Sequence, residues 1–212
     1  MFHPGPSRAG RWRATSDRRD LRTRCGTVTN DWTSIAAEQP GKVVQLCYLV
    51  PDIAAAVANW TRRMGAGPFF HACFDMEGQR FGDLPARGML EVAVGYRRGM
   101  NIELAAYSGA GPAIYDPAST GVGYGLHHVQ VACEDIDAAI ADHAARDEAI
   151  VTDHVVPGFG RAVMVDMRDM LGHFVEYGAW TPAVHAALAA MEAAHGEWDG
   201  RDPLRPYPRL DD

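Results

Sequence analysis

The sequence has few cysteines and none of the spacings that cysteine-based sites use. Its four cysteines lie at positions 25, 47, 73 and 133, and no two of them form a CxxC pair. A chain of 212 residues with so few cysteines is not expected to depend on a disulfide framework. We therefore expect buried thiols.

Several other features are missing. No apolar run reaches the roughly 18–20 residues of a membrane span, and the N-terminus lacks the apolar core of a secretory signal. The sequence contains neither an HExxH pair nor a GxxxxGK[ST] phosphate loop. The net charge is −7, which disfavours nucleic acid as a partner. We predict a cytoplasmic protein that binds neither nucleic acid nor membranes.

The charge is distributed unevenly along the chain. Residues 1–30 carry seven arginines and two aspartates, a charge of +5, which leaves −12 for the rest. Pro, Gly and Ser accompany the arginines, and the two aspartates argue against a targeting peptide. We predict an irregular N-terminal extension over residues 1–40.

One short pattern occurs twice in the remaining chain. The first copy begins at Gln45 and reaches Asp52 seven residues later, and the second begins at His128 and reaches Asp135 at the same spacing. Isoleucine and an Ala-rich stretch follow each aspartate, as expected for a capped helix. A repeat of this kind predicts two similar modules with paired, equivalent positions.

Each copy predicts the order β-α-β-β-β. In the first module strands are expected at 43–50, 68–75, 89–96 and 100–107, and a helix at 53–64. In the second, strands are expected at 127–133, 150–155, 161–166 and 171–178, and a helix at 136–147. The predicted boundaries are 41–107 for the first module, 108–125 for a Gly-rich linker, 126–180 for the second module and 181–212 for a C-terminal helix and tail.

Strand alternation places four polar side chains on one face. Gln45 and His128 open the two modules, and Glu103 and Glu176 lie on the strands that close them. Their strand neighbours are mostly apolar and are expected to face the helices, because successive side chains point to opposite faces. We predict that all four lie on the face away from the helices, where a concave sheet would gather them.

These four residue types form a plausible metal shell. Two carboxylates, one imidazole and one amide oxygen suit a borderline divalent cation, and burying two carboxylates side by side without a cation would be costly. Taken singly, each residue has an ordinary structural alternative. Together, Gln45, Glu103, His128 and Glu176 predict a site for one divalent metal ion.

Weaker candidates surround this set. His71 lies in an aromatic strand, Arg80 in the loop over 76–87 and Arg161 after a Gly-rich turn, so that each is a candidate for the substrate pocket. The alternative for His71 is a purely structural role. For Arg80 it is a position in a solvated loop, and for Arg161 a position beside an ordinary hairpin turn. His143 and His154 are expected at the surface.

At this point the chain resembles the vicinal oxygen chelate superfamily, also called the glyoxalase/bleomycin resistance/dioxygenase superfamily, and looks like a glyoxalase-like member. The resemblance covers about residues 42–180 and rests on the paired modules, their openings at Gln45 and His128, and their endings at Glu103 and Glu176. It implies an α+β fold in which two paired βαβββ modules form a cupped mixed sheet with helices on the outer face. It also implies a homodimer.

The same resemblance implies the activity. The Gln/Glu/His/Glu set is similar to the glyoxalase I type, in which one divalent ion (Zn, Ni, Co, Mn or Fe) is held by these positions. We expect a metal-dependent isomerase, epimerase or lyase that abstracts a proton next to a carbonyl of a small oxygenated substrate through a metal-stabilised enediolate. Glu176 is the expected base, and Glu103 a ligand or second acid/base.

Two alternatives remain from the sequence. Extradiol ring-cleaving dioxygenases typically use two histidines and one glutamate, whereas Gln45 stands at the first position here. A non-catalytic protein that binds a drug or another small molecule would not need the four ligands.

Overall fold

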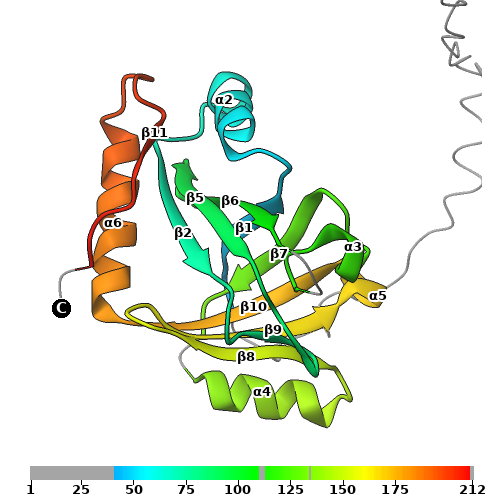
Figure 1. Ribbon diagram of the computed structural model, residues 1–212. Helices are drawn as coiled ribbons and strands as arrows, with labels where there is room; N and C mark the ends of the chain where they lie inside the picture. Colours follow the sequence, from blue (N-terminus) through cyan, green and yellow to red (C-terminus); the bar gives the residue numbers. More distant parts are fainter. Residues whose placement is uncertain (1–40, 110–112, 134, 211–212) are drawn as a thin grey trace, which may run out of the picture. The chain divides into compact units, whose positions relative to one another are not determined.

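The computed structural model describes residues 41–109, 113–133 and 135–210 (Figure 1). The predicted extension over residues 1–40 lies outside this part of the chain. In the described ranges the chain forms a nine-stranded mixed sheet with a small two-stranded hairpin and several helices. This is the predicted α+β class.

The first half follows the predicted element order. It contains β1 (Val43–Leu49), α2 (Ile53–Met64), β2 (Phe69–Asp75), β5 (Met89–Arg97) and β6 (Met100–Ser108). The expected loop over 76–87 contains the short hairpin of β3 (Arg80–Phe81) and β4 (Leu84–Pro85).

The second half repeats this order. It contains β7 (Gly125–Val131), α4 (Ile136–Ala145), β8 (Ile150–Val156), β9 (Gly160–Met167), α5 (Arg168–Leu171) and β10 (His173–Trp180). The last strand was expected to begin at Leu171, but α5 occupies that position. Gly172, with φ at 79°, ends this short helix, because glycine adopts the left-handed conformation without steric cost.

Three further elements lie outside the two modules. They are α3 (Pro117–Thr120) in the predicted linker, α6 (Pro182–Gly196) and β11 (Leu204–Pro206). Helix α6 has the predicted extent. None of the described helices is long and apolar enough to span a membrane.

The repeated aspartates cap the two matching helices. Asp52 Oδ1 accepts a hydrogen bond from the Ala55 amide at 2.7 Å, and Asp135 Oδ1 accepts one from the Ala138 amide at 2.9 Å. Each carboxylate thereby satisfies one of the amides that a helix start leaves without a partner. The two caps set how each helix leaves its opening strand.

The two modules meet through their opening strands. The sheet order is β11-β2-β5-β6-β1-β7-β10-β9-β8, and β1 pairs with β7 in antiparallel fashion. Each opening strand also pairs in parallel with its own closing strand, β1 with β6 and β7 with β10. The four strands that carry the predicted site residues are therefore adjacent at the centre of the sheet.

The two faces of the sheet are packed differently. On the outer face, α2 packs Ile53 and Val57 against apolar side chains of β1 and β6, and α4 packs Ile136 and Ala139 against β7, β9 and β10. The inner face carries a separate core of twelve buried residues that includes Cys47 and Phe174. The predicted separation of helices from the candidate site residues is confirmed for α2 and α4.

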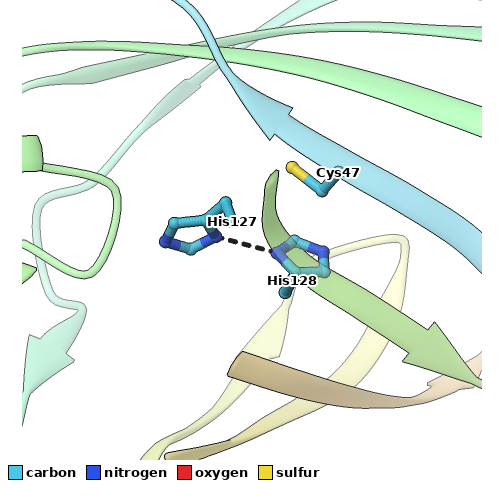
Figure 2. A group of neighbouring side chains, drawn as sticks. All are labelled: Cys47, His127 and His128. Carbon is cyan, nitrogen blue, oxygen red and sulfur yellow. Dashed lines mark hydrogen bonds between the residues drawn. The ribbon is translucent and has the colours of Figure 1, made fainter. Parts of the chain in front are cut away.

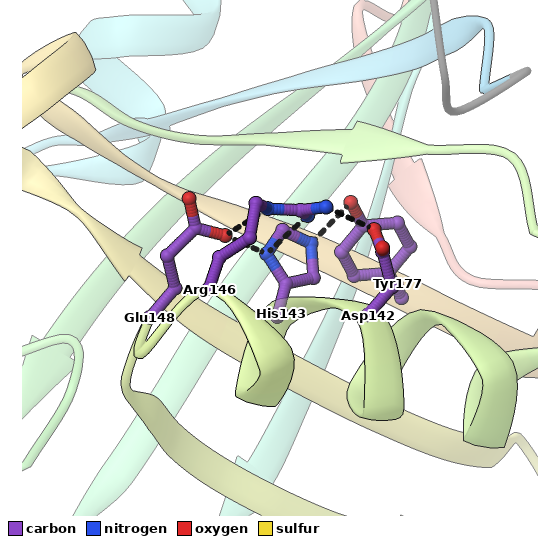
Figure 3. A network of polar contacts seen from close by, with 5 residues as sticks. All are labelled: Asp142, His143, Arg146, Glu148 and Tyr177. Atoms are coloured by element: carbon purple, nitrogen blue, oxygen red, sulfur yellow. Dashed lines mark hydrogen bonds and ion pairs between the residues drawn. The ribbon is translucent and has the colours of Figure 1, made fainter.

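A polar network fixes α4 to the outer face (Figure 3). His143 is buried, with Nε2 2.7 Å from the Tyr177 hydroxyl and Nδ1 2.5 Å from Glu148 Oε2. Arg146 contacts Glu148 and Asp142. The expectation that His143 is a surface residue was wrong, because the imidazole bridges the helix and β10.

Helix α6 packs on the inner face, unlike α2 and α4. Its residues Ala187 and Met191 form a buried cluster with Phe70, Val94 and Tyr96 of strands β2 and β5. The C-terminal helix therefore covers part of the face that carries the candidate site.

Candidate functional site

A cavity of about 130 Å³ lies on the inner face of the sheet. Both modules and the C-terminal segment contribute to its wall. The lining residues are Gln45, Phe74, Gln79, Leu90, Val92, Val94, Glu103, Tyr115, Gln130, His154, Val156, Phe159, Ala162, Glu176, Trp180, Val184, Leu188 and Tyr207. The polar part of this wall comes mainly from the four central strands.

The four predicted metal ligands lie together at this polar part. Gln45, Glu103 and Glu176 line the cavity, and His128 is fully buried behind it. His128 Nε2 lies 3.5 Å from Glu176 Oε2 and 3.8 Å from Glu103 Oε2. Two carboxylates from different modules therefore approach one imidazole nitrogen.

A bulge in β7 gives His128 a second histidine as its partner. The register steps from Cys47 opposite His128 to Tyr48 opposite Leu126, so that His127 is an extra residue. A bulge interrupts the alternation that would send neighbouring side chains to opposite faces. Both imidazoles are buried, and their Nδ1 atoms lie 2.9 Å apart (Figure 2).

The contacts of His127 determine which nitrogen of His128 faces the carboxylates. His127 Nε2 lies 2.8 Å from the Ile114 carbonyl oxygen, which can only accept, so this nitrogen carries the proton. Burial and the nearby His128 lower the pKa of His127 to about 3, which keeps its ring neutral. His127 Nδ1 is then an acceptor for the Nδ1–H of His128. Neutral His128 presents the Nε2 lone pair to the two glutamates.

Gln45 is held in a comparable way. Its Nε2 donates to Asn101 Oδ1 at 3.1 Å, across the parallel pairing of β1 and β6. Among the described residues, three buried side-chain atoms have no hydrogen-bond partner: Gln45 Oε1, His128 Nε2 and, outside this cluster, Thr152 Oγ1. Buried polar atoms without a partner are uncommon, and the Gln45 and His128 atoms are the metal-ligating atoms of their side chains.

Gln130 fixes the Glu176 carboxylate. Its Nε2 donates to Glu176 Oε2 at 2.6 Å, and its Oε1 accepts from Trp180 Nε1 at 3.4 Å. Gln130 lies opposite Glu176 on paired strands, as Cys47 lies opposite Glu103 in the first module. The repeat therefore extends beyond the four predicted ligands to their immediate neighbours.

The surroundings of the two carboxyl groups shift their pKa values in opposite directions. Burial, opposed by His128 and reinforced by Glu176, raises the pKa of Glu103 from 4.5 to about 7. Burial also acts to raise the pKa of Glu176, but His128 and the hydrogen bond from Gln130 lower it overall. The two glutamates outweigh the burial of His128 and raise its pKa. Without a metal, the same imidazole therefore faces one carboxyl whose pKa is raised and one whose pKa is lowered.

The comparison with protein families decides the assignment. Residues 44–165, more than half of the chain, match the model of the glyoxalase/bleomycin resistance protein/dioxygenase superfamily.

The chain belongs to this superfamily.

Solved structures with a similar fold are distant in sequence. A hypothetical protein from Bacillus halodurans is 17% identical over 66% of this chain and 94% of its own, with a TM-score of 0.48. Methylmalonyl-CoA epimerase from Mycobacterium tuberculosis is 17% identical over 68% and 91%, with a TM-score of 0.46. A variant of the Streptomyces coelicolor epimerase in complex with 2-nitronate-propionyl-CoA is 16% identical over 66% and 98%, with a TM-score of 0.46. No curated protein matches the chain in sequence.

Two further groups in this superfamily member have the residue types of a metal site. Cys47, His127 and His128 bring ligand atoms within 4.8 Å of one another (Figure 2). Burial, together with Glu103 and Glu176, raises the pKa of the Cys47 thiol well above its usual range, which disfavours the thiolate that a metal needs. The other group, His71, Cys73 and Glu91, lies on strands β2 and β5 and is partly or fully exposed.

The three weaker pocket candidates lie away from the cavity wall. His71 Nε2 is 3.2 Å from Glu91 Oε2, on the strand face opposite to cavity-lining Phe74. Arg80 donates to the backbone oxygen of Asp83 within the β3–β4 hairpin. Arg161 pairs with Asp137 at 2.7 Å and with Asp153 at 2.8 Å. Each of these side chains has a hydrogen-bond or ion-pair partner nearby in the structure, and none of the three lines the cavity.

Several cavity residues were not predicted from the sequence. Tyr115 lies in the predicted linker, yet it is buried, lines the cavity and stacks on His127 at 4.9 Å. His154 lines the cavity and is half-buried, contrary to the expected surface position. Gln130 was recognisable in principle, since it shares a strand face with His128, but a lone strand glutamine carries no chemical signal. Tyr115 has no sequence signal at all, because the segment around it reads as a turn-rich linker.

Proposed function

We propose that this superfamily member is a metal-dependent isomerase, epimerase or lyase of the glyoxalase type, which moves a proton next to a carbonyl group. The observation that carries the proposal is the buried cluster of Gln45, Glu103, His128 and Glu176 at the polar end of a cavity. These residues supply both metal ligands and proton-accepting groups at one place. Glyoxalase-type chemistry requires that combination.

The residues present fit a divalent cation. Gln45 Oε1 and His128 Nε2 are buried without hydrogen-bond partners, and each is held by a neighbour that occupies its other polar atom. Neighbours of this kind orient metal ligands and fix the histidine tautomer. Glu103 and Glu176 complete a shell with the expected charge for Zn, Ni, Co, Mn or Fe. When bound, such an ion would supply Lewis-acid polarisation of a substrate oxygen.

The contacts of the two glutamates support different roles. Glu176 accepts a short hydrogen bond from Gln130 and faces His128, so that its carboxylate is held in place. Glu103 has the Cys47 thiol as its hydrogen-bond neighbour, and thiols are weak donors. A less restrained carboxylate is better suited to accept a proton from substrate and return it. We therefore assign proton transfer to Glu103 and anchoring to Glu176, the reverse of the sequence-based expectation for the base.

One chain supplies all four residues. Strands β1 and β7 pair within the chain, so that both modules contribute to the same cluster. The proposed site therefore does not need a second subunit. A homodimer and a small carbonyl-containing substrate remain predictions.

Metal analysis and proton exchange test the proposal together. Purified protein is expected to hold about one divalent ion per chain by elemental analysis, with loss in His128→Ala and retention in the outer-face control His143→Ala. In deuterium oxide, α-hydroxyacetophenone should exchange the protons next to its carbonyl, which NMR measures directly. Glu103→Gln should reduce this exchange by at least about 100-fold while the metal stays bound.

Two other outcomes would exclude the proposed activity. A protein that takes up no metal after reconstitution with zinc, nickel, cobalt, manganese or iron does not have the proposed activity. The five aromatic side chains of the cavity wall also suit a catechol ring, as the dioxygenase alternative requires. Oxygen consumption with catechol under ferrous iron, without exchange of the hydroxyketone, would establish that alternative.

A further inference from the structure

The cavity wall has two chemically different parts. One end is the polar floor of Gln45, Glu103, Gln130 and Glu176. Most other lining side chains are apolar or aromatic, with contributions from both modules and from the C-terminal segment. A molecule in this cavity would meet amide and carboxyl groups at one end and mainly apolar or aromatic side chains elsewhere, with Gln79 and His154 as further polar lining residues. Pockets of this kind take orientation from the polar end and affinity from the apolar wall.

Among the described residues no lysine or arginine lines the cavity. Three arginines of the surrounding elements have acidic or backbone partners: Arg161 pairs with Asp137 and Asp153, Arg168 with Asp166, and Arg80 with the Asp83 carbonyl. His154 is the lining side chain that could become cationic, and burial lowers its pKa. A negative group away from the floor would therefore be desolvated without a cation, which is unfavourable.

The size and shape of the wall suit one ring. The cavity volume of about 130 Å³ is close to the roughly 150 Å³ of an engineered cavity that holds one benzene molecule. Phe74, Tyr115, Phe159, Trp180 and Tyr207 contribute aromatic surface to the wall. Phe159 contacts both Phe74 and Tyr207, with ring centroids 5.2 and 5.7 Å apart, so that three of these rings form one continuous surface. Aromatic rings pack favourably on such surfaces in edge-to-face or offset arrangements.

The C-terminal segment supplies part of this wall. Val184, Leu188 and Tyr207 lie after β10, in the helix and tail that follow the second module, and Trp180 is the last residue of β10. Helix α6 is anchored on the inner face through Ala187 and Met191, which holds Val184 and Leu188 at the cavity. Trp180 also reaches the polar floor through its hydrogen bond to Gln130. The helix and tail that follow the second module therefore contribute part of the apolar wall.

We propose that the cavity selects an uncharged, ring-sized apolar compound with two neighbouring oxygens at one end, and that α6 forms the wall that disfavours charged analogues. The inference rests on the proposed function for the orientation of the two oxygens toward the floor. The apolar selection itself depends only on the cavity wall.

Binding of two matched probes tests this selection without turnover. The probes are para-methylcatechol and protocatechuate, which carry a methyl group or a carboxylate at the same ring position. Isothermal titration is performed on zinc-loaded and metal-free full-length protein, because zinc has no redox chemistry and leaves the catechols intact. We expect para-methylcatechol to bind at least about tenfold more tightly than protocatechuate in both forms.

A positive charge placed on α6 tests the role of this helix in the preference between the two probes. Leu188→Arg adds a cation to the wall and should reduce or reverse the preference by strengthening protocatechuate binding. Ala189→Arg adds the same charge at an exposed position of the same helix and should leave the wild-type preference unchanged. Thermal unfolding of each variant establishes that it is folded.

The outcomes separate this inference from the proposed activity. Equal or tighter binding of protocatechuate by the wild type, no binding of either probe at millimolar concentration, or the same response in both arginine variants would overturn the substrate class. A wild-type preference with no metal uptake and no proton exchange would retain the substrate class and remove the proposed activity.

Discussion

The Nδ1 atoms of His127 and His128 lie 2.9 Å apart, although the two residues are neighbours on one strand. The bulge at His127 makes this contact possible, and the Ile114 carbonyl fixes its direction by accepting from His127 Nε2. His128 is thereby oriented with Nε2 toward Glu103 and Glu176. The carbonyl group of Ile114, in the connection between β6 and β7, thus sets the tautomer of the proposed metal ligand His128 through His127.

His127→Leu is expected to weaken zinc binding by about 10–100-fold, because the Nδ1–H of His128 would lose its acceptor. His127→Gln should bind more tightly than His127→Leu, since an amide oxygen can accept the same proton. Competition with a chromophoric chelator measures the dissociation constants. His143→Leu removes another buried, doubly hydrogen-bonded imidazole on the outer face and should leave zinc affinity unchanged. Wild-type affinity in His127→Leu would show that His127 does not orient His128.

Gln130→Leu is expected to reduce zinc affinity by about tenfold, because Glu176 would lose the charge-assisted hydrogen bond that holds its carboxylate. The pKa of Glu176 should rise in the metal-free variant for the same reason. Gln79→Leu changes another cavity-lining glutamine outside the carboxylate cluster and serves as the control. Equal zinc affinities for the two variants would exclude this role for Gln130.

The contribution of Glu103 to the stability of the metal-free protein should fall as the pH rises from about 4.5 to about 7. The folded-state pKa of Glu103 is raised to about 7, so its contribution to stability is present in acid and is lost as the carboxyl ionises. The raised pKa of His128 acts in the same direction, but from about pH 6.5 upward, whereas the lowered pKa of His127 acts oppositely below about pH 6.5. The lowered pKa of Glu176 acts oppositely, and its contribution is lost only on acidification below about 4.5.

Urea unfolding of wild-type protein and of Glu103→Gln across this pH range measures the effect. The difference in unfolding free energy between the two should change steadily through the window, because only the wild type has the titrating Glu103 carboxyl. Saturating zinc should remove the difference in slope, since a cation favours the ionised carboxylate. Parallel pH profiles for the two metal-free proteins would contradict the raised pKa.

Asp52→Ala and Asp135→Ala should each lower the free energy of unfolding by about 1 kcal/mol, because each removes a helix N-cap. The corresponding asparagine variants should retain most of the stability, since the amide oxygen still accepts from the helix. Zinc affinity is expected to stay constant, as both caps belong to outer-face helices. A loss far above about 2 kcal/mol would mean that the carboxylates do more than cap.

The local parts of the fold were predictable because they follow from short-range rules. Asp52 and Asp135 mark helix starts by their side-chain chemistry, and Gly65, with φ at 64°, ends the first helix in the left-handed conformation. Strand alternation correctly separated the residues that pack on α2 and α4 from those on the inner face. The repeat then linked the equivalent positions of the two modules.

Other features depend on contacts between distant segments. Arg161 follows a Gly-rich turn and looked available to a substrate, but it pairs with Asp137 and Asp153 from two other elements. His154 and His143 have surface-like sequence surroundings, yet one lines the cavity and the other bridges α4 to β10. The environment of such a side chain depends on partners that are distant in the sequence. A pattern of neighbouring residues therefore cannot predict it.

The sequence by itself determined that Gln45, Glu103, His128 and Glu176 share one face, because alternation along a strand and the repeat depend only on residue spacing. Only the tertiary structure decided how these four residues meet and what surrounds them. The antiparallel pairing of β1 with β7 joins the modules, and the bulge at His127 supplies a partner for His128. Tyr115 and helix α6 then complete the cavity wall. Strand register and the packing of connections are set by the balance of long-range contacts, which no short segment of the sequence encodes.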